Sequence, residues 1–555
     1  MTYLSEPVLL VENLSLTFPD ANRASGHNVL SNLTFDLRKG EVLGIVGDSG
    51  SGKTMTALAV AGLLPENAEV TSGRIMFDGK DLLKLKPSDR RKLLGDKIGM
   101  IFQEPLSSFN PLMTIGKHLN EVLTSHSNLL LPKEHADGRK SRILEMLAHV
   151  GFTDPLRIYN AFPHQISGGQ RQRALIAGTL LLKPTLLIAD EPTTALDTVT
   201  QSQIVDQLKR ISRSFNLSVL FISHDLMLVE RICDRVAVMH NRRIVELETP
   251  KDILHSPTHP HTAKLIRSAR AVRTPRVKQE TNYSDDNPPL IQIKGLNTGY
   301  NDSIFFGASR YHEVLRDVNI DIYPGEILGL IGSSGCGKTT LTRVLTGLIS
   351  ATNGTITENG RIMADFSQRK KMKRCSVGLV FQDPYNSLNP AKTISWLLEE
   401  PLRIHGICDR IERKTRVLQM LSDVGLGSKY QHYYPHQLSG GQRQRVALAV
   451  SLMLSPSLII ADEPVSALDA SVQAQILELL FKINREKGVA FLFISHNLSV
   501  VRSICHRVAI MDDGRIVEAG AIDEVFDKPS TVVASNLLKA ETNYHPRSNR
   551  TIDSQ

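Results

Sequence analysis

Six short segments occur twice in this chain, in the same order. The first set begins with GDSGSGKT at residues 47–54 and ends with ISHD at His224, and the second runs from GSSGCGKT at residues 332–339 to ISHN at His496. Between these ends each half carries FQEP or FQDP, then SGGQRQR, an apolar run ending in ADEP, and ALD. A repeat on this scale predicts two copies of one folding unit. At 555 residues, each copy is long enough to bury its own core.

The spacing of the repeat separates a rigid part from a variable part. Lys53 and Lys338 are 285 residues apart, and Gln103 and Gln382 are 279 apart. From SGGQ to the histidine the offset stays at 272. The stretch between the glutamine and SGGQ is therefore free to vary, and the later segments keep one fixed length.

Apolar strands alternate with helices in each half. EVLGIVG and LLIAD in the first half, and EILGLIG and LIIAD in the second, read as buried strands, and TMTALAVAGLL and TLTRVLTGLI read as helices. This alternation predicts an α/β core with a largely parallel sheet. The segments VLLVENLSLTF and LIQIKGLNTGY alternate in polarity and predict an extra antiparallel layer.

Composition is that of an ordinary globular protein, with 41% hydrophobic and 22% charged residues and no uninterrupted run of 18 apolar residues. The first residues lack a basic region ahead of an apolar core, so we expect no secretory signal and a cytosolic chain. The net charge of +8 fits either a basic solvated surface or an anionic partner, and composition favours the first. The five cysteines lack metal-ligand spacing, and Cys233 and Cys505, at matching points of the repeat, are interpreted as packing residues.

We predict a first domain at residues 1–266, a linker at 267–288 and a second domain at 289–555. The linker carries arginines at three-residue spacing and then the polar stretch NYSDDNPPL. A basic helical face on lipid is the alternative, but no large apolar residues lie opposite the arginines, which favours a solvated linker.

The two glycine loops predict phosphate sites at helix N-termini. Their glycines let the backbone approach phosphate, the lysine places a charge at the β- and γ-phosphates, and the threonine offers a hydroxyl to Mg²⁺. The predicted nucleotide-binding residues are Gly47, Asp48, Ser49, Gly50, Ser51, Gly52, Lys53 and Thr54, and Gly332, Ser333, Ser334, Gly335, Cys336, Gly337, Lys338 and Thr339.

Acids end the second apolar strand of each half. Asp190 and Asp462 are costly at such a buried position unless they face an ion, which indicates the Mg²⁺ shell. Glu191 and Glu463 come one residue later and point elsewhere, as a general base for an attacking water requires.

A histidine and a glutamine complete each predicted site. A lone histidine after a strand is usually structural, but His224 and His496 each follow their glutamate by 33 residues, which favours a γ-phosphate sensor. Gln103 and Gln382 follow apolar strands and could bridge Mg²⁺, water and the loop beyond. The predicted catalytic residues are thus Glu191, His224, Gln103, Glu463, His496 and Gln382, and the predicted metal residues are Thr54, Gln103, Asp190, Thr339, Gln382 and Asp462.

The SGGQ segments predict a second anion-binding position in each half, because a serine and two glycines precede a helix. Since each half already has its own phosphate loop, we interpret each SGGQ as completing the site of the other half, with two ATP molecules between the halves. The residues concerned are Ser167, Gly168, Gly169 and Gln170, and Ser439, Gly440, Gly441 and Gln442.

These segments closely resemble those of the ABC-type ATPases over nearly the whole chain. FQEPLSSFNP, FQDPYNSLNP, YPHQLSGGQRQR, DEPVSALDASVQAQIL and SPTHPHTAKLI are similar to the ATPase subunits of oligopeptide and dipeptide importers, here fused as a pair. The resemblance implies two tandem nucleotide-binding domains, each with a P-loop RecA-like core, a helical subdomain and an antiparallel β layer. It also implies hydrolysis of ATP with Mg²⁺ that drives solute import.

The resemblance further implies partners and a location. Two integral-membrane permease subunits would dock at the helical regions after Gln103 and Gln382, and an extracytoplasmic solute-binding protein would deliver the solute. The chain would lie peripherally on the cytoplasmic face of the inner membrane, without nucleic acid. Some relatives bind an iron–sulfur cluster through cysteines after the first domain, and their absence here predicts no cluster.

Several positions depart from the pattern. HNRRIVELE lacks the glycines of DDGRIVEAG, with Arg242 at the place of Gly514, so we expect that turn to differ. His261 stands where the family usually has tyrosine, and the second half keeps only a remnant, KPSTVVASNLL, of that segment. Phe18 and Tyr300 are candidates for adenine stacking, with a core role as the alternative.

Other functions are less consistent with the sequence. A tandem ATPase acting on ribosomes is expected to carry a long charged helical linker, a DNA-repair ATPase zinc-ligand cysteine pairs, and an exporter membrane spans. The identity of the solute is not encoded in these segments.

Overall fold

The computed structural model describes residues 7–20, 23–102, 108–126, 136–193, 196–272, 287–303, 309–333, 335–366, 377–407, 409–466 and 468–544. The chain divides into two compact units, Met1–Ser268 and Ala269–Gln555. The predicted linker begins within helix α10 (Pro260–Ala271), and its residues 273–286 lie outside the described residues.

The first unit contains two sheets. The four-stranded sheet is antiparallel, in the order β2-β1-β4-β5, and the six-stranded sheet has the order β10-β9-β3-β8-β7-β6, in which only β10 is antiparallel. The strands are β1 (Pro7–Asp20), β2 (Arg23–Arg38), β3 (Val42–Gly47), β4 (Glu69–Phe77), β5 (Lys80–Asp81), β6 (Ile98–Ile101), β7 (Leu186–Asp190), β8 (Ser218–Ile222), β9 (Arg235–His240) and β10 (Arg243–Glu248). The helices are α1 (Lys53–Ala61), α2 (Pro87–Leu93), α3 (Ile115–Ser125), α4 (Ala136–His149), α5 (Pro155–Asn160), the 3₁₀ helix η2 (Pro163–Gln165), α6 (Gly168–Leu180), α7 (Thr198–Phe215), α8 (Leu226–Ile232), α9 (Pro250–His255) and α10.

The second unit repeats this arrangement. Its sheets have the orders β12-β11-β14-β15 and β20-β19-β13-β18-β17-β16. The strands are β11 (Ile291–Ser303), β12 (Ser309–Ile322), β13 (Ile327–Gly332), β14 (Asn353–Glu358), β15 (Arg361–Asp365), β16 (Val377–Val380), β17 (Leu458–Asp462), β18 (Ala490–Ile494), β19 (Arg507–Asp512) and β20 (Arg515–Ala521). The helices are α11 (Lys338–Leu345), α12 (Pro384–Ser387), α13 (Ile394–Ile404), α14 (Arg410–Asp423), the 3₁₀ helices η3 (Ser428–His432) and η4 (Pro435–Gln437), α15 (Gly440–Leu452), α16 (Ala470–Lys487), α17 (Leu498–Ile504), α18 (Ile522–Asp527) and α19 (Val532–Tyr544).

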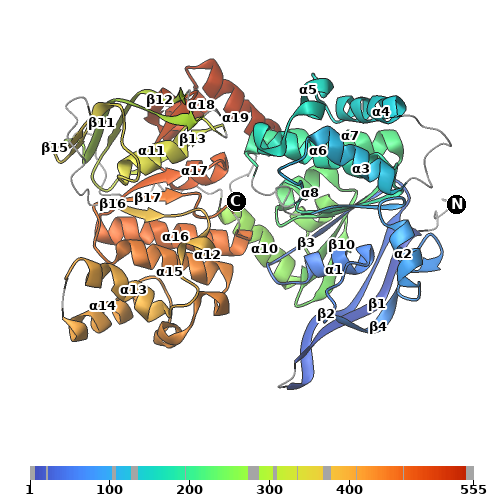
Figure 1. Cartoon of the computed structure of the whole chain (residues 1–555). Helices are drawn as coiled ribbons and strands as arrows, with labels where there is room; N and C mark the ends of the chain where they lie inside the picture. The colour runs from blue at the N-terminus through green and yellow to red at the C-terminus, as the bar shows by residue number, and fades with distance from the viewer. Residues whose placement is uncertain are drawn as a thin grey trace, which may run out of the picture. The chain divides into compact units, whose positions relative to one another are not determined.

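The predicted α/β core and antiparallel layer are both confirmed. All six residues of β3 and of β13 are buried, as continuous apolar strands of a covered parallel sheet require. One core cluster of the first unit joins apolar side chains of β1, β2, β4, the mixed sheet and α1, so this helix packs between the two sheets. In the first unit, helices α3, α4 and α5 lie at the opposite end of the mixed sheet from the antiparallel sheet (Figure 1). Helices α13 and α14 take the same place in the second unit.

The turn between β9 and β10 corrects one expectation. We expected it to differ from the turn between β19 and β20, because Arg242 replaces Gly514. Both turns instead use two successive left-handed residues, Asn241 and Arg242 at φ 48° and 69°, and Asp513 and Gly514 at φ 41° and 79°. Closing a two-residue hairpin sets this backbone in both units, and Arg242 adopts it without glycine.

Among the described residues, no helix is both long enough and apolar enough to span a bilayer. Cys233 and Cys505 are buried free thiols whose pKa burial raises, which confirms them as packing residues.

Candidate ATP sites

In each unit, the glycine loop begins at the carboxyl end of a central strand of the mixed sheet, β3 or β13. A Cβ on Gly47 would lie 2.3 Å from the Met239 carbonyl oxygen, and one on Gly332 would lie 2.2 Å from that of Met511, so neither position accepts a side chain. Each loop then leads into a helix whose first residue is the predicted lysine. The backbone amides at these helix N-termini are suited to bind phosphate.

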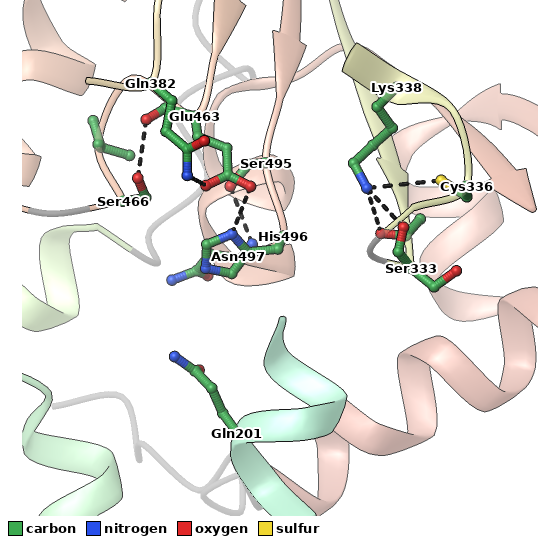
Figure 2. Close-up of polar contacts among 12 residues, drawn as sticks. Gln201, Ser333, Cys336, Lys338, Gln382, Glu463, Ser466, Ser495, His496 and Asn497 are labelled. Carbon is green, nitrogen blue, oxygen red and sulfur yellow. Dashed lines mark hydrogen bonds and ion pairs between the residues drawn. The ribbon is translucent and has the colours of Figure 1, made fainter. Parts of the chain in front are cut away.

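Both lysines fold back over their own loops. Lys53 Nζ donates to the carbonyl oxygens of Gly47 at 2.8 Å and Asp48 at 3.0 Å. Lys338 Nζ makes the same bonds to Gly332 at 2.8 Å and Ser333 at 3.0 Å (Figure 2). The two ammonium groups therefore sit above the loops, where they can exchange carbonyl contacts for phosphate oxygens.

An aspartate faces each loop from the end of β7 or β17, which is separated by one strand from the strand that carries the loop. Burial first, and then the charge of Glu191, raises the pKa of Asp190 to about 6, against the opposing hydrogen bond of Thr54. Burial and Glu463 likewise raise the pKa of Asp462 to about 6. Asp190 Oδ1 is buried without a hydrogen-bond partner. A carboxylate with a spare oxygen beside a threonine hydroxyl is a donor set that fits Mg²⁺.

The glutamates that follow adopt a left-handed backbone. Glu191 has φ 46° and Glu463 has φ 48°, a region that costs a non-glycine residue energy and often marks functional sites. Their amides donate to the carbonyl oxygens of Ile222 at 3.0 Å and Ile494 at 2.9 Å, which anchors both residues at the sheet edge.

Each predicted histidine contacts its glutamate. His224 Nδ1 lies 3.1 Å from Glu191 Oε1, and His496 Nδ1 lies 3.0 Å from Glu463 Oε1. Burial lowers the pKa of His224, but the hydrogen bond and charge of Glu191 outweigh it and leave that pKa raised. The constant spacing of 33 residues thus corresponds to a direct contact in both units.

Gln382 completes this cluster in the second unit. Its Nε2 donates to Glu463 Oε2 at 2.8 Å, so that the glutamate is held by the glutamine on one oxygen and the histidine on the other (Figure 2). Ser466 Oγ donates to the Glu463 carbonyl oxygen at 3.2 Å, a contact that sequence reasoning did not foresee. The predicted residues Gln103 and Ser334 lie outside the described residues.

The SGGQ segments correct a detail of the prediction. Gly168, Gly169, Gly440 and Gly441 do not precede a helix but are the first residues of α6 and α15. In each segment the serine and the glutamine form a reciprocal capping box. Ser167 and Ser439 are exposed.

The two glycines of each SGGQ have different surroundings. A Cβ on Gly169 would lie 2.2 Å from Thr200 Cγ2, and one on Gly441 would lie 2.3 Å from Val472 Cγ1, so the second glycine allows close helix packing. A Cβ on the first glycine would lie no closer than 3.3 Å to any other atom, so this position leaves the helix N-terminus open to a ligand.

The aromatic candidates differ between the units. Tyr300 Oη lies 3.3 Å from Thr340 Oγ1, on the helix that follows the second glycine loop, and the tyrosine is 36% exposed. Phe18 is half-buried in β1. Their role in adenine stacking stays a prediction.

The sequence interpretation missed a contact of Asp48. His261 Nε2 lies 3.4 Å from Asp48 Oδ2, and His240 stacks on His261. The sequence shows only that the second half has Asp512 and Val533 where the first has these histidines, which marks a difference between the halves but does not indicate the contact.

Known proteins match both halves. The family model described as ABC transporter matches residues 30–194 and 315–466, more than half of the chain. The glutathione import ATP-binding protein GsiA of Pectobacterium atrosepticum is 39% identical, over 96% of this chain and 89% of that protein. The uncharacterized ABC transporter ATP-binding protein YejF of Escherichia coli is 39% identical, over 96% of this chain and 99% of that protein.

Among solved structures, the dimeric structure of MJ0796, a bacterial ABC transporter cassette, matches 44% of this chain and 98% of that chain, with 27% identity and a TM-score of 0.39. The doubled family match, the full-length relatives and the paired lysine, aspartate, glutamate and histidine sites agree. The chain belongs to the ABC transporter ATPases, in a form that carries two ATP-binding cassettes in one polypeptide.

Proposed function

We propose that this chain is the energy-coupling subunit of an importer for peptides or peptide-like solutes, with glutathione as one candidate. The relatives of similar length that span both halves include glutathione import ATP-binding proteins, which supports this substrate class. The observation that carries the ATPase function is the glutamate–histidine contact, present at 3.1 Å and 3.0 Å in the two units.

In hydrolysis, water attacks the γ-phosphorus of ATP, the bond to the β-phosphate oxygen breaks, and ADP and phosphate leave. Glu191 and Glu463 take the proton of that water, and their histidines orient them and contact the γ-phosphate. Lys53 and Lys338 neutralise the phosphate charge that the glycine loops hold. Gln382 holds Glu463 until nucleotide enters.

Mg²⁺ would supply neutralisation of the phosphate charge at each site. Thr54, Asp190 and Gln103 would hold it in the first unit. Thr339, Asp462 and Gln382 would hold it in the second. The raised pKa values support this assignment, because a cation favours the ionised carboxylate that burial disfavours.

We propose that both ATP sites are composite. Residues 439–442 would complete the site of the first glycine loop, and residues 167–170 would complete that of the second. Exposed serines at two helix N-termini, each with an open first glycine, support a second anion position in each half.

Paired double variants test the composite sites. Aspartate at Gly168 or Gly440 adds a charge that repels phosphate but suits a helix N-terminus. A Cβ at Gly168 would lie 3.3 Å from Leu196 and 3.9 Å from Arg171, and one at Gly440 would lie 3.5 Å from Leu468, so neither clashes. Lys53→Ala with Gly440→Asp damages one composite site, so one slowly exchanging ATP per chain should remain. Lys53→Ala with Gly168→Asp damages both, and no such ATP should remain. The reverse pattern would show that each SGGQ serves its own half.

We also propose that two permease subunits dock beside the glutamine segments, with an extracytoplasmic binding protein in the same complex, on the cytoplasmic face of the inner membrane. An apolar hollow in the first unit, lined by Phe102, Phe109 and Leu119 among others, supports this, as do exposed fractions of 43% for Phe102 and 48% for Phe381. Phe102→Glu with Phe381→Glu should abolish copurification with the permease and leave ATP binding intact. Recovery of the native chain only with ribosomes or nucleoid would contradict the importer.

A further inference from the structure

Three side chains of the first unit converge beside its glycine loop. Strands β3 and β9 are parallel, with Gly47 opposite Met239, so the next residues, Asp48 and His240, leave the same edge of the sheet as neighbours. His261 reaches them from the first turn of α10.

A buried glutamate fixes the segment that carries His261. Glu246 of β10 accepts hydrogen bonds from the Thr258 amide at 2.8 Å, the Thr258 hydroxyl at 2.9 Å and the His259 amide at 3.2 Å. Glu518 holds Ser530 and Thr531 in the same way, so the second unit keeps this docking although its segment is only a remnant. The position of His261 is therefore set by the fold.

The convergence brings three potential metal-binding atoms together. One ligand atom each of Asp48, His240 and His261 lies within 4.8 Å of the other two. The imidazole rings of His240 and His261 stack with centroids 3.6 Å apart and planes 19° apart. Tetrahedral Zn²⁺ with bonds of about 2.0–2.1 Å holds its ligand atoms roughly 3.3 Å apart, so small side-chain rotations suffice.

Two of these side chains contain a buried polar atom that makes no hydrogen bond. These atoms are Asp48 Oδ1 and His261 Nε2, although His261 Nε2 lies 3.4 Å from Asp48 Oδ2. The His261 side chain is only 10% exposed. A buried polar atom that makes no hydrogen bond costs about 1–3 kcal/mol, which a bound ion offsets.

We propose that Asp48, His240 and His261 form a binding site for a transition-metal ion of the Zn²⁺ type. Two imidazole nitrogens and one carboxylate oxygen suit Zn²⁺, whereas Mg²⁺ and Ca²⁺ require oxygen ligands. The fourth tetrahedral position is left for water. Because Asp48 belongs to the glycine loop, the ion ties that loop to the start of α10.

The second unit provides an internal control. The corresponding residues there are Ser333, Asp512 and Val533, which offer one carboxylate and no imidazole. The site is therefore specific to the first half, and the full chain should bind one ion at this position.

Zinc binding to the full chain tests the site. After dialysis against a chelator, the chain is titrated with Zn²⁺ in excess Mg²⁺ and in competition with a chromophoric chelator. We expect one tight ion per chain with a Kd of micromolar or below. His240→Gln and His261→Phe should each weaken this binding at least tenfold, whereas the exposed His255→Gln should not change it.

Thermal melting separates loss of the site from loss of the fold. Zn²⁺ should raise the melting temperature of the wild type and of His255→Gln by a few degrees, and leave His240→Gln and His261→Phe unchanged. Absence of tight Zn²⁺ binding by the wild type, or binding that survives both histidine substitutions, would overturn the proposal.

Discussion

The two glycine loops share a backbone and a chemistry but not their surroundings. In both units the lysine makes the same pair of carbonyl contacts, and the aspartate has a pKa of about 6. Around them, Asp48, His240 and His261 flank the first loop, whereas Cys336 Sγ lies 3.7 Å from Lys338 Nζ in the second. The difference teaches that the strand ends that handle phosphate are retained, while the periphery of each loop has diverged.

Because the two sites share this chemistry, we expect both halves to hydrolyse ATP. Substitution of each glutamate tests this and should give the largest effects. Glu191→Gln and Glu463→Gln should each lower turnover at their own site about 10²–10³-fold, because the amide cannot accept the proton of the attacking water. Single-turnover hydrolysis by the assembled transporter measures this. ATP binding should persist, since glutamine keeps the size of glutamate. Unchanged turnover in one variant would show that the halves differ in chemistry.

Much of each site could be predicted from the sequence. Asp190 ends a buried strand, and Glu191 and His224 come just after buried strands. The carboxyl ends of parallel strands meet at one sheet edge, so the proximity of these residues follows from the strand assignment. Contacts that depend on docking could not be predicted. His261 meets Asp48 only because Glu246 fixes the segment before α10, and no local pattern encodes a contact between residues 213 positions apart.

Local sequence was also misleading where tertiary structure overrides it. The glycine of a DDGR turn predicts a left-handed residue, and its absence from HNRR predicted a different turn. Closure of the hairpin and the hydrogen bond from the Ser31 amide to the Arg242 carbonyl oxygen, at 2.9 Å, impose the left-handed backbone on arginine.

The buried aspartates offer a second test of equivalence, through stability. A carboxyl whose pKa rises from 3.8 unfolded to about 6 folded makes the protein lose stability as pH rises from about 4 to 6. The full loss is about 3 kcal/mol per aspartate. Asp190→Asn and Asp462→Asn should therefore raise the melting temperature at pH 7.5 without Mg²⁺ or nucleotide.

The gain should disappear near pH 4, where the wild-type carboxyl is protonated. Melting curves at several pH values in chelator measure both variants against the wild type. Added Mg²⁺ and ATP should stabilise the wild type more than either variant. If only one variant had a higher melting temperature than the wild type, only the aspartate replaced in that variant would destabilise the protein through its burial.

The smallest expected effects concern the turns between β9 and β10 and between β19 and β20. These turns have the same backbone conformation but different residues. A Cβ on Gly514 would lie 2.1 Å from the Val314 carbonyl oxygen, so Gly514→Ala should destabilise the second unit by about 1–3 kcal/mol. Arg242→Gly should relieve about 1–2 kcal/mol of left-handed strain. Glycine also loses about 0.4–1 kcal/mol more conformational entropy on folding, so the net gain should stay below about 1.6 kcal/mol. Urea unfolding of each variant measures these changes. A harmless Gly514→Ala would mean that the second hairpin can shift to admit a side chain, as the first must have done for Arg242, and that the glycine is not required by the turn.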